Sequence, residues 1–322
     1  MTQIIEPGGS GPQKAVGPEF SVVIPTYNRL DTLVQVVDAL ENQVDAPGFE
    51  AVIINDGSTD ATARWLEQKD FRADVRVINQ KNQGPASARN RGIQVSEGKK
   101  IAFLGDDTVP LEGWLAAHNE AHFSRGNPDD LAVIGYTTWH PRIRATRFLD
   151  YINEYGLQFG YSLIEDPEDL PFNFFYTSNM SLSSGLLKQE RFDEGFPQAC
   201  WEDIELGYRL KRKGMRMVYA KEAIVQHDHF TGIRQFAKRE ESVGYSAVRL
   251  YGLCPEIDFL GMTPDGPLPL PPSRMLWLER WFVTVFQYLP LSFPKIWEKI
   301  MRYHYMKGLH RGWEDAAKPA SG

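Results

Sequence analysis

The sequence predicts an α/β fold in which helices flank a mostly parallel sheet, with a helical appendage at the C-terminal end. Four short apolar runs recur over roughly the first hundred residues, and a helical pattern separates each run from the next. Such alternation is typical of βαβ units, whose crossover connections make the strands parallel. The runs, apolar enough for burial on both faces, are Phe20–Ile24, Ala51–Ile54, Val75–Ile78 and Ile101–Leu104.

One helix is predicted between each strand and the next, which gives three helices. The first has apolar residues on one side at helical spacing, the second follows Asp60, and the third begins after Gly84 at Pro85. Proline at that place supports a helix start, because its missing N–H would be unpaired there anyway. The apolar side of the first helix comprises Leu30, Leu33, Val34, Val37 and Leu40.

The second half of the chain mixes short strands with helices. We predict a helix over Glu202–Lys213, ending before Gly214, because glycine is favoured just after a helix. A pair of strands is expected over Met217–Tyr219 and Ala223–Gln226, followed by a helix over Ile233–Leu250.

The predicted domain organisation has four parts. Residues 1–18 are polar and rich in Gly and Pro, and we expect a disordered leader. Residues 19–252 form the main domain, with a first half over 19–107 and a second half over 108–252. A proline-rich linker over 253–273 precedes an aromatic and basic helical tail over 274–322.

Composition excludes several functional classes. The net charge of −7 gives no basic field that would attract nucleic acid. Cys200 and Cys254 are the only cysteines and lie far apart, which fits a reducing compartment and predicts a cytoplasmic location. The leader lacks the charged start and apolar core of a secretion signal. The sequence contains no run of about 18 apolar residues, so we predict no helix that spans a membrane.

Polar, turn-forming residues follow each of the four predicted strands. Parallel sheets bind ligands beyond the carboxyl ends of their strands, so we expect these four segments to converge on one rim. For any single segment the alternative is a simple turn, because Asn, Asp and Gly are common turn residues. The segments are Pro25–Arg29, Asn55–Ser58, Asn79–Gly84 and Gly105–Asp107.

Two carboxylate motifs at this rim suggest chemistry. Asp106 and Asp107 are adjacent on a tight turn and repel each other unless a cation stabilises them, which favours a Mg²⁺ or Mn²⁺ site. The alternative is a solvated acidic turn. Asp56 could accept hydrogen bonds from a base or a ribose hydroxyl, or it could belong to a turn that precedes a capped helix.

Three further motifs have both a chemical and a structural interpretation. Glu202 and Asp203 could supply a general base, or they could complement a helix dipole in a first turn. His227 and His229 share one side of a strand and could complete a metal site with an Asp, or they could be ordinary surface residues. Arg89 could neutralise a pyrophosphate or lie on a solvated helix face.

Taken in order, these motifs resemble glycosyltransferase family 2, whose members have the GT-A fold. The resemblance covers roughly residues 19–250. The segments identify the family only when they occur together in this order, because each one alone is common. The matching segments are Val22–Arg29, Ile54–Asp60, Asn82–Ala86 with Ala88–Asn90, Phe103–Asp107 and Trp201–Asp203.

The resemblance implies a role for each matching residue. Asp107 would coordinate Mn²⁺ or Mg²⁺ together with His227, with His229 as the fallback, and Gly105 stands where many members have the first Asp of their DXD site. Asp203 would be the catalytic base. Beside it, Glu202 would hold the acceptor, with Asn179 and Trp201 on the acceptor side. The nucleotide-sugar would be bound by Pro25, Thr26, Tyr27, Asn28, Arg29, Asp56, Gly84, Arg89 and Asp106.

The implied activity is metal-dependent, inverting transfer of a sugar from a nucleotide-diphosphate donor of UDP, GDP or dTDP type. The acceptor would be a hydroxyl of a glycan or of a lipid-linked molecule, as in cell-surface polysaccharide synthesis. One alternative is a sugar nucleotidyltransferase, which would favour a glycine-rich phosphate loop where this chain has Pro25–Arg29. Another is a non-catalytic module that binds nucleotide-sugars, against which Asp107 and Asp203 argue.

The tail leaves two interpretations open. Its aromatic and basic residues suit peripheral contact with the inner face of the cell membrane, where anionic lipids attract cations. The alternative is that its helices pack on the domain or on a partner copy in a homodimer. The residues concerned are Trp277, Trp281, Phe282, Phe286, Lys295, Trp297, Lys299, Arg302, Tyr303, Tyr305, Lys307 and Arg311.

Overall fold

The computed structural model describes residues 4–5, 17–156, 158–197, 200–272, 277 and 293–318. The chain divides into two compact units. Unit 1 comprises residues 1–143, 164–194 and 206–229, and unit 2 comprises residues 144–163, 195–205 and 230–322. Most of the expected leader lies outside the described residues.

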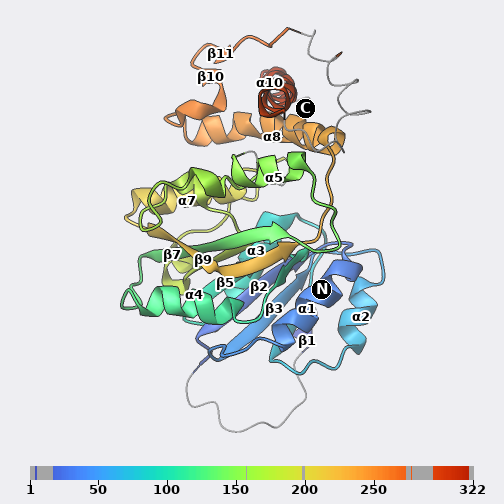
Figure 1. Ribbon diagram of the computed structural model, residues 1–322, viewed down its shortest axis with the longest axis vertical. Coiled ribbons are helices and arrows are strands. Elements are labelled where there is room, and N and C mark those ends of the chain that lie inside the picture. Colours follow the sequence, from blue (N-terminus) through green and yellow to red (C-terminus); the bar gives the residue numbers. More distant parts are fainter. Residues whose placement is uncertain are drawn as a thin grey trace. The chain divides into compact units, whose positions relative to one another are not determined.

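The sheet of unit 1 confirms the predicted fold class (Figure 1). Its strands lie in the order β1-β4-β3-β2-β5-β8-β7-β9-β6, and the neighbours β4, β3, β2 and β5 are mutually parallel. These four are the predicted strands. The nine strands are β1 (Ile4–Ile5), β2 (Phe20–Thr26), β3 (Phe49–Asn55), β4 (Val75–Asn79), β5 (Lys100–Leu104), β6 (Thr108–Pro110), β7 (Leu131–Trp139), β8 (Asn179–Ser183) and β9 (Arg216–His227).

Helices cover both faces of this sheet. Strand residues alternate between two hydrophobic cores, as in β2, where Val22 and Ile24 join one core and Val23 the other. The first core receives α1 (Leu30–Glu41), α2 (Thr62–Gln68) and α4 (Trp114–Phe123). The second receives α3 (Pro85–Val95), α6 (Ser184–Gln189) and the later residues of α7 (Glu202–Arg212), with the short 3-10 helix η2 (Phe172–Phe174).

The expected strand pair near residue 220 is wrong, because β9 is one continuous strand. It runs parallel to β7, with Gly135 opposite Ala220 and Tyr136 opposite Ile224, so residues 221–223 bulge out of register. The polar Lys221-Glu222 step therefore marks a bulge and not a turn. Gly135 allows this close approach, since an added Cβ would lie 2.2 Å from the Ala223 carbonyl oxygen.

A buried polar network lies inside unit 1, and it corrects the expected acceptor-side role of Asn179. Trp114 Nε1 donates to Asn179 Oδ1 at 2.7 Å, and His118 Nε2 lies 3.0 Å from the same oxygen. Ser181 Oγ lies 2.9 Å from a ring nitrogen of His118 and of His122. All five side chains are at most 1% exposed. Asn179 therefore links β8 to α4 inside the core and lines no surface.

Burial lowers the pKa of His118 to about 4 and that of His122 to about 3. An unfolded histidine takes up its proton near pH 6.5, so the unfolded state binds more protons between these values and pH 6.5. We therefore expect the free energy of unfolding to fall as the pH drops below about 6.5, by up to about 1.4 kcal/mol per pH unit for each histidine. Urea unfolding at several pH values measures this slope.

The variant His118→Gln cannot titrate and should flatten the acid slope of stability, even though it lowers stability overall. His310→Gln serves as its control, because that histidine lies on α10 (Pro294–Ala316) in an exposed hydrogen bond. An unchanged slope in His118→Gln would show that this buried ring does not cause the acid sensitivity.

Unit 2 is built around two helices that touch backbone to backbone. An added Cβ at Gly244 of α8 (Ile233–Leu253) would lie 1.9 Å from the Tyr305 carbonyl oxygen, and one at Gly308 of α10 would lie 1.9 Å from that of Glu241. The other elements of this unit are α5 (Arg147–Glu154), η1 (Tyr161–Leu163), η3 (Asp258–Leu260), β10 (Met262–Thr263) and β11 (Gly266–Pro267).

This packing changes the expected domain boundary at residue 252. The helix that ends the expected main domain packs on the helix of the tail, so both belong to unit 2. The expected linker carries a small antiparallel pair, β10 with β11. The predicted helix over Ile233–Leu250 is confirmed within α8.

Part of the described tail packs on protein, whereas Trp277 is 65% exposed and Lys295, Lys299 and Arg302 are also exposed. Trp297 is 2% exposed and its ring lies 5.6 Å from that of Phe148, while Tyr303 is 7% exposed. Lys307 and Arg311 both form ion pairs with Glu241 of α8. These side chains therefore hold unit 2 together, which favours the packing interpretation for them. Trp281, Phe282 and Phe286 lie outside the described residues.

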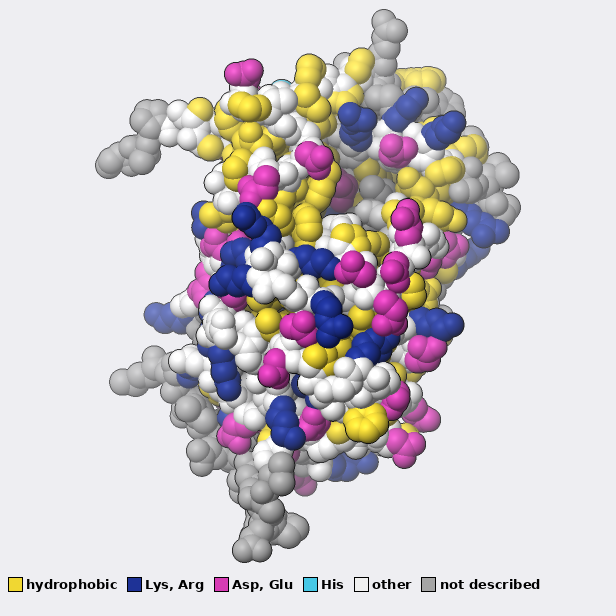
Figure 2. Space-filling model, turned by 90° about the vertical axis from the view of Figure 1, so that its left-hand side faces the viewer, with side chains coloured by type: hydrophobic (Ala, Val, Ile, Leu, Met, Phe, Trp, Pro, Cys, Tyr) yellow, Lys and Arg dark blue, Asp and Glu magenta, His cyan; other side chains and the backbone are white. Residues whose placement is uncertain are grey.

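On the face drawn in Figure 2, acidic and basic side chains are interspersed and neither sign dominates. Within the described part of the chain, no helix combines the length and apolar character needed to cross a membrane. Neither Cys200 nor Cys254 forms a disulfide.

Candidate active site

The carboxyl ends of β2, β3, β4 and β5 meet at one edge of the sheet of unit 1, as the sequence predicts. Hydrogen bonds join the segments that follow these strands. Asn55 Nδ2 donates to Asn79 Oδ1 at 2.8 Å, and the Asp56 N–H donates to the Thr26 carbonyl at 2.9 Å. The rim is therefore one connected surface and not a set of separate turns.

Asn28 holds two of these segments together. Its backbone has φ +53°, a conformation that Asn tolerates better than most residues. Its Oδ1 atom accepts hydrogen bonds from the N–H groups of Thr59 and Asp60 at 2.7 and 3.2 Å. Within the same segment Tyr27 is 45% exposed, whereas Thr26 is 2% exposed. Of the predicted nucleotide residues in this loop, Tyr27 and Asn28 are exposed and Arg29 is partly exposed.

Asp56 is 4% exposed and anchors the segment before α3. Its Oδ1 atom accepts from Gln80 Nε2 at 2.8 Å and from the Gln83 N–H at 2.9 Å, while Oδ2 accepts from the Gly84 N–H at 2.8 Å. Gly84 has φ +88°, which favours glycine. A carboxylate has about four acceptor sites, so these three bonds leave Asp56 about one for a ligand.

Asp107 lies at the centre of a cluster of cationic and imidazole groups. Arg29 Nη1 donates to its Oδ2 atom at 2.8 Å, and His227 Nε2 lies 3.5 Å from the same oxygen. His229 Nδ1 lies 3.4 Å from Arg29 Nη1. His227 is therefore the histidine nearer to the Asp107 oxygen, and His229 contacts the arginine.

The two adjacent carboxyl groups have opposite pKa shifts. Burial and the charge of Asp107 raise the pKa of Asp106 above its usual range. Burial also tends to raise the pKa of Asp107, but the hydrogen bond and charge of His227, together with Arg29, outweigh it and lower that pKa. The negative charge of the pair is therefore concentrated on Asp107.

Gly105 stands before the two carboxylates in a position with little room for a side chain. An added Cβ at this position would lie 3.0 Å from Thr108 Oγ1 and 3.2 Å from Asp107 Oδ1. A larger residue would need these two neighbours to shift. The Thr108 side chain is held in place, because its hydroxyl donates to the carbonyl oxygens of Gly105 and Ser178 at 2.9 and 3.1 Å.

Asp107 and His227 fit a divalent cation such as Mn²⁺, for which a carboxylate oxygen and an imidazole nitrogen are suitable ligands. Among the described residues, no group of three or more His, Cys, Asp or Glu side chains is arranged to hold a metal ion. A cation held by these two side chains would complete its shell with substrate oxygens and water, as Mg²⁺ commonly does. The guanidinium of Arg29 shows that this oxygen attracts positive charge.

Two contacts around His227 were not predicted from the sequence. The ring of Trp139, at the end of β7, stacks on His227 with centroids 5.5 Å apart. Asp228, whose side chain is 1% exposed, forms an ion pair with Arg142 and accepts from Gln35 Nε2 at 3.2 Å. Both contacts fix the end of β9. Neither could be found from spacing, because each partner is far away in the sequence.

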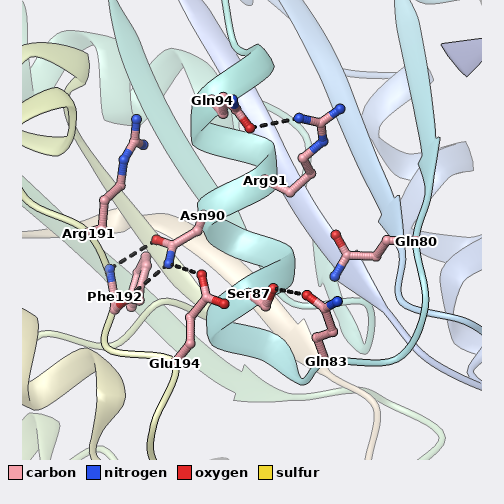
Figure 3. A pocket seen from close by; sticks show the side chains of 9 residues that line it. All are labelled: Gln80, Gln83, Ser87, Asn90, Arg91, Gln94, Arg191, Phe192 and Glu194. Atoms are coloured by element: carbon pink, nitrogen blue, oxygen red, sulfur yellow. Dashed lines mark hydrogen bonds between the residues drawn. The ribbon is translucent and has the colours of Figure 1, made fainter. Parts of the chain in front are cut away.

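Arg89 and a pocket lie along α3. The guanidinium of Arg89 lies over the ring of Phe192, 5.6 Å from its centroid. Figure 3 shows the pocket, of about 570 Å³, with Asn90 bonded to the Phe192 backbone and to Glu194. Ser87 also donates to Gln83, and Arg91 donates to Gln94. The pocket is lined by Gln80, Gln83, Ser87, Asn90, Arg91, Gln94, Arg191, Phe192 and Glu194.

The acidic segment at the start of α7 belongs to unit 2 up to Glu205. Glu202 and Glu205 are 5% and 3% exposed, whereas Asp203 is half-buried. Trp201 precedes them with φ +75°, a strained conformation for a bulky residue, and its Nε1 donates to the Val243 carbonyl of α8 at 2.8 Å. A strained backbone persists only where neighbouring contacts hold it in place. Here the hydrogen bond from the Trp201 indole to α8 holds Trp201, and it thereby positions Glu202, which follows it.

Comparison with known proteins gives one family. Residues 21–157 match the family described as Glycosyl transferase family 2. The chain is 32% identical over 241 residues to validoxylamine A glucosyltransferase of Streptomyces hygroscopicus subsp. limoneus, covering 64% of this chain and 51% of the relative. It is 27% identical over 225 residues to hyaluronan synthase of Pasteurella multocida, covering 61% and 23%. The chain thus spans about half the length of the first relative and less of the second.

Solved structures show the same fold. The mannosyltransferase PcManGT from Pyrobaculum calidifontis, in complex with GDP-Man and Mn²⁺, aligns with a TM-score of 0.61 at 18% identity, covering 96% of this chain and 91% of that one. S. aureus TarS 1–349 in complex with UDP aligns with a TM-score of 0.51 at 16% identity, covering 91% of both chains.

Proposed function

Because residues 21–157 match glycosyl transferase family 2, we propose that this chain moves a sugar from a nucleoside-diphosphate donor to an acceptor hydroxyl, with a divalent cation and with inversion at the anomeric carbon. The family match and the relatives named glycosyltransferases support the transferase activity. The cation, the inversion and the acceptor are the proposal.

One observation carries the metal-dependent donor site. Asp107, His227 and Arg29 meet around a single carboxylate oxygen at the rim where four parallel strands end. Open α/β sheets bind ligands at that edge. The Asp107 oxygen has both an arginine and a histidine beside it, which is more than an exposed aspartate in a turn requires. The cluster is therefore suited to bind a cation at the carboxylate and a negatively charged ligand at the arginine.

Each residue of the rim has a task in the proposed reaction. Tyr27 offers an exposed ring beside the nucleotide, and Asp56 keeps the segment at the start of α3 in place while accepting about one more hydrogen bond. Asp106 lies next to Asp107, and its carboxylate can accept a hydrogen bond from a sugar or ribose hydroxyl. A cation held by Asp107 and His227 would supply neutralisation of the charge that grows on the leaving diphosphate.

Asp203 is proposed to take the proton of the acceptor hydroxyl as the new bond forms. The half-buried Asp203 remains accessible, whereas Glu202 is buried beside it and is proposed to fix the local geometry. Attack on the face of the sugar opposite the leaving diphosphate inverts the anomeric carbon. A glycan acceptor is supported by the family relative named hyaluronan synthase, and a reducing, cytoplasmic location by the two free cysteines.

A screen of nucleotide-sugars for thermal stabilisation tests the proposal. A ligand that binds only the folded state raises the melting temperature, and a ligand at 100 times its Kd adds about 2.7 kcal/mol of stability. We expect at least one UDP-, GDP- or dTDP-sugar to raise Tm with Mn²⁺ and to do so less with EDTA. ATP serves as the control triphosphate. Stabilisation by ATP alone, or by no sugar nucleotide at all, would contradict the donor site.

A further inference from the structure

Arg29 occupies the place beside Asp107 where a metal ligand shell would form. Its Nη1 atom lies 2.8 Å from Asp107 Oδ2, the same oxygen that His227 approaches to 3.5 Å. A divalent cation bonded to that oxygen and to His227 would stand next to the guanidinium. Two cations so close repel each other, so the oxygen cannot keep both partners at full strength.

The backbone of Arg29 is fixed, whereas its side chain is partly exposed and contacts only Asp107 and His229 among the printed polar partners of its Nη1 atom. Arg29 is the N-cap residue of α1, and its carbonyl accepts from the Leu33 N–H at 2.9 Å. The preceding Asn28 is bonded to the Thr59 and Asp60 backbone. The side chain of Arg29 is 36% exposed, compared with 17% for that of Asp107. A long exposed side chain on a fixed backbone can change partners without moving the loop.

We propose that Arg29 is an exchangeable counter-ion: it neutralises Asp107 when no metal is bound, is displaced when a divalent cation arrives, and then pairs with the donor diphosphate. This inference rests on the proposed function for the identity of the anion. Arginine suits the second task because its planar group donates two parallel hydrogen bonds to phosphate oxygens. The exchange makes metal and nucleotide binding cooperative. The metal releases Arg29, which then pairs with the nucleotide, and the nucleotide draws Arg29 away from Asp107, which then binds the metal.

Metal binding alone tests the exchange. Mn²⁺ titrated without nucleotide, with free Mn²⁺ followed by electron paramagnetic resonance, should bind Arg29→Gln roughly tenfold more tightly than the wild type, because the competing cation is gone. Arg29→Lys keeps the charge and should stay near the wild type. Arg64→Gln, an exposed arginine on α2, controls for the change in net charge.

The second half of the test is calorimetry with UDP and with GDP at saturating Mn²⁺. Arg29→Gln should bind the stabilising nucleotide roughly tenfold more weakly than the wild type, so the cooperativity between Mn²⁺ and nucleotide shrinks. Equal Mn²⁺ affinity in Arg29→Gln and wild type overturns the exchange, as does the absence of Mn²⁺ binding in both. The second result would mean that Arg29 itself serves as the permanent cation. Neither outcome depends on sugar transfer, which the donor screen tests separately.

Discussion

Replacing Asp203 by Asn is expected to lower the rate of sugar transfer by roughly 10²- to 10⁴-fold, the usual contribution of a positioned general base. Asn keeps the size of the side chain and can still accept from the Ile204 N–H, which Asp203 Oδ1 accepts at 3.0 Å. It cannot take a proton. The fall should appear in kcat, while the Kd of the donor with Mn²⁺ stays unchanged. Initial rates and calorimetry on the same preparations measure both.

Two further variants separate the base from general damage to the acidic segment. Asp258→Asn removes an exposed carboxylate of unit 2 and should leave transfer unchanged. Glu202→Gln keeps the volume of the buried neighbour but removes its charge and one acceptor oxygen, so it should lower thermal stability as well as activity. Turnover by Asp203→Asn at the wild-type rate would remove Asp203 from the mechanism.

The parallel half of the fold could be predicted because its signals are local. Each of the first four strands is a continuous apolar run, and each helix between them has a start signal or an apolar face within its own residues. The bulge in β9 could not be predicted, because Lys221 and Glu222 are typical of a turn. Only the long-range pairing with β7 across Gly135 keeps that strand continuous.

The same distinction applies to the site. The rim residues follow predictable strands, so their gathering at one edge was predicted. The pairing of Arg29 with Asp107 was not, since a sequence shows neither the distance between two loops nor the path of a long side chain. Asn179 shows the opposite error. A polar residue in a strand suggests a surface, but here its amide satisfies a tryptophan and a histidine inside the core.

Replacing Asp107 by Asn should remove the effect of Mn²⁺ on donor binding and lower kcat/KM by roughly 10²-fold or more, since stabilisation by a metal is worth several kcal/mol. Asn can still accept a hydrogen bond from Arg29, so the loops should keep their positions, but it has no charge to attract a cation. The measurement is donor affinity by calorimetry with Mn²⁺ and with EDTA.

The control for this variant is Asp129→Asn, an exposed carboxylate of the same unit. It changes the net charge equally and should keep the full response of donor affinity to Mn²⁺. If Asp107→Asn also kept that response, the cation would have to bind elsewhere, and the pairing of Arg29 with Asp107 would be a purely structural ion pair. If instead both the response and the thermal stability collapsed, the carboxylate would be holding the rim together. The expected result is a lost response to Mn²⁺ in a protein that still folds but has a moderately lower Tm, because Arg29 keeps a hydrogen-bond partner and loses the ion pair. That result would assign the charge of Asp107 to ligand binding.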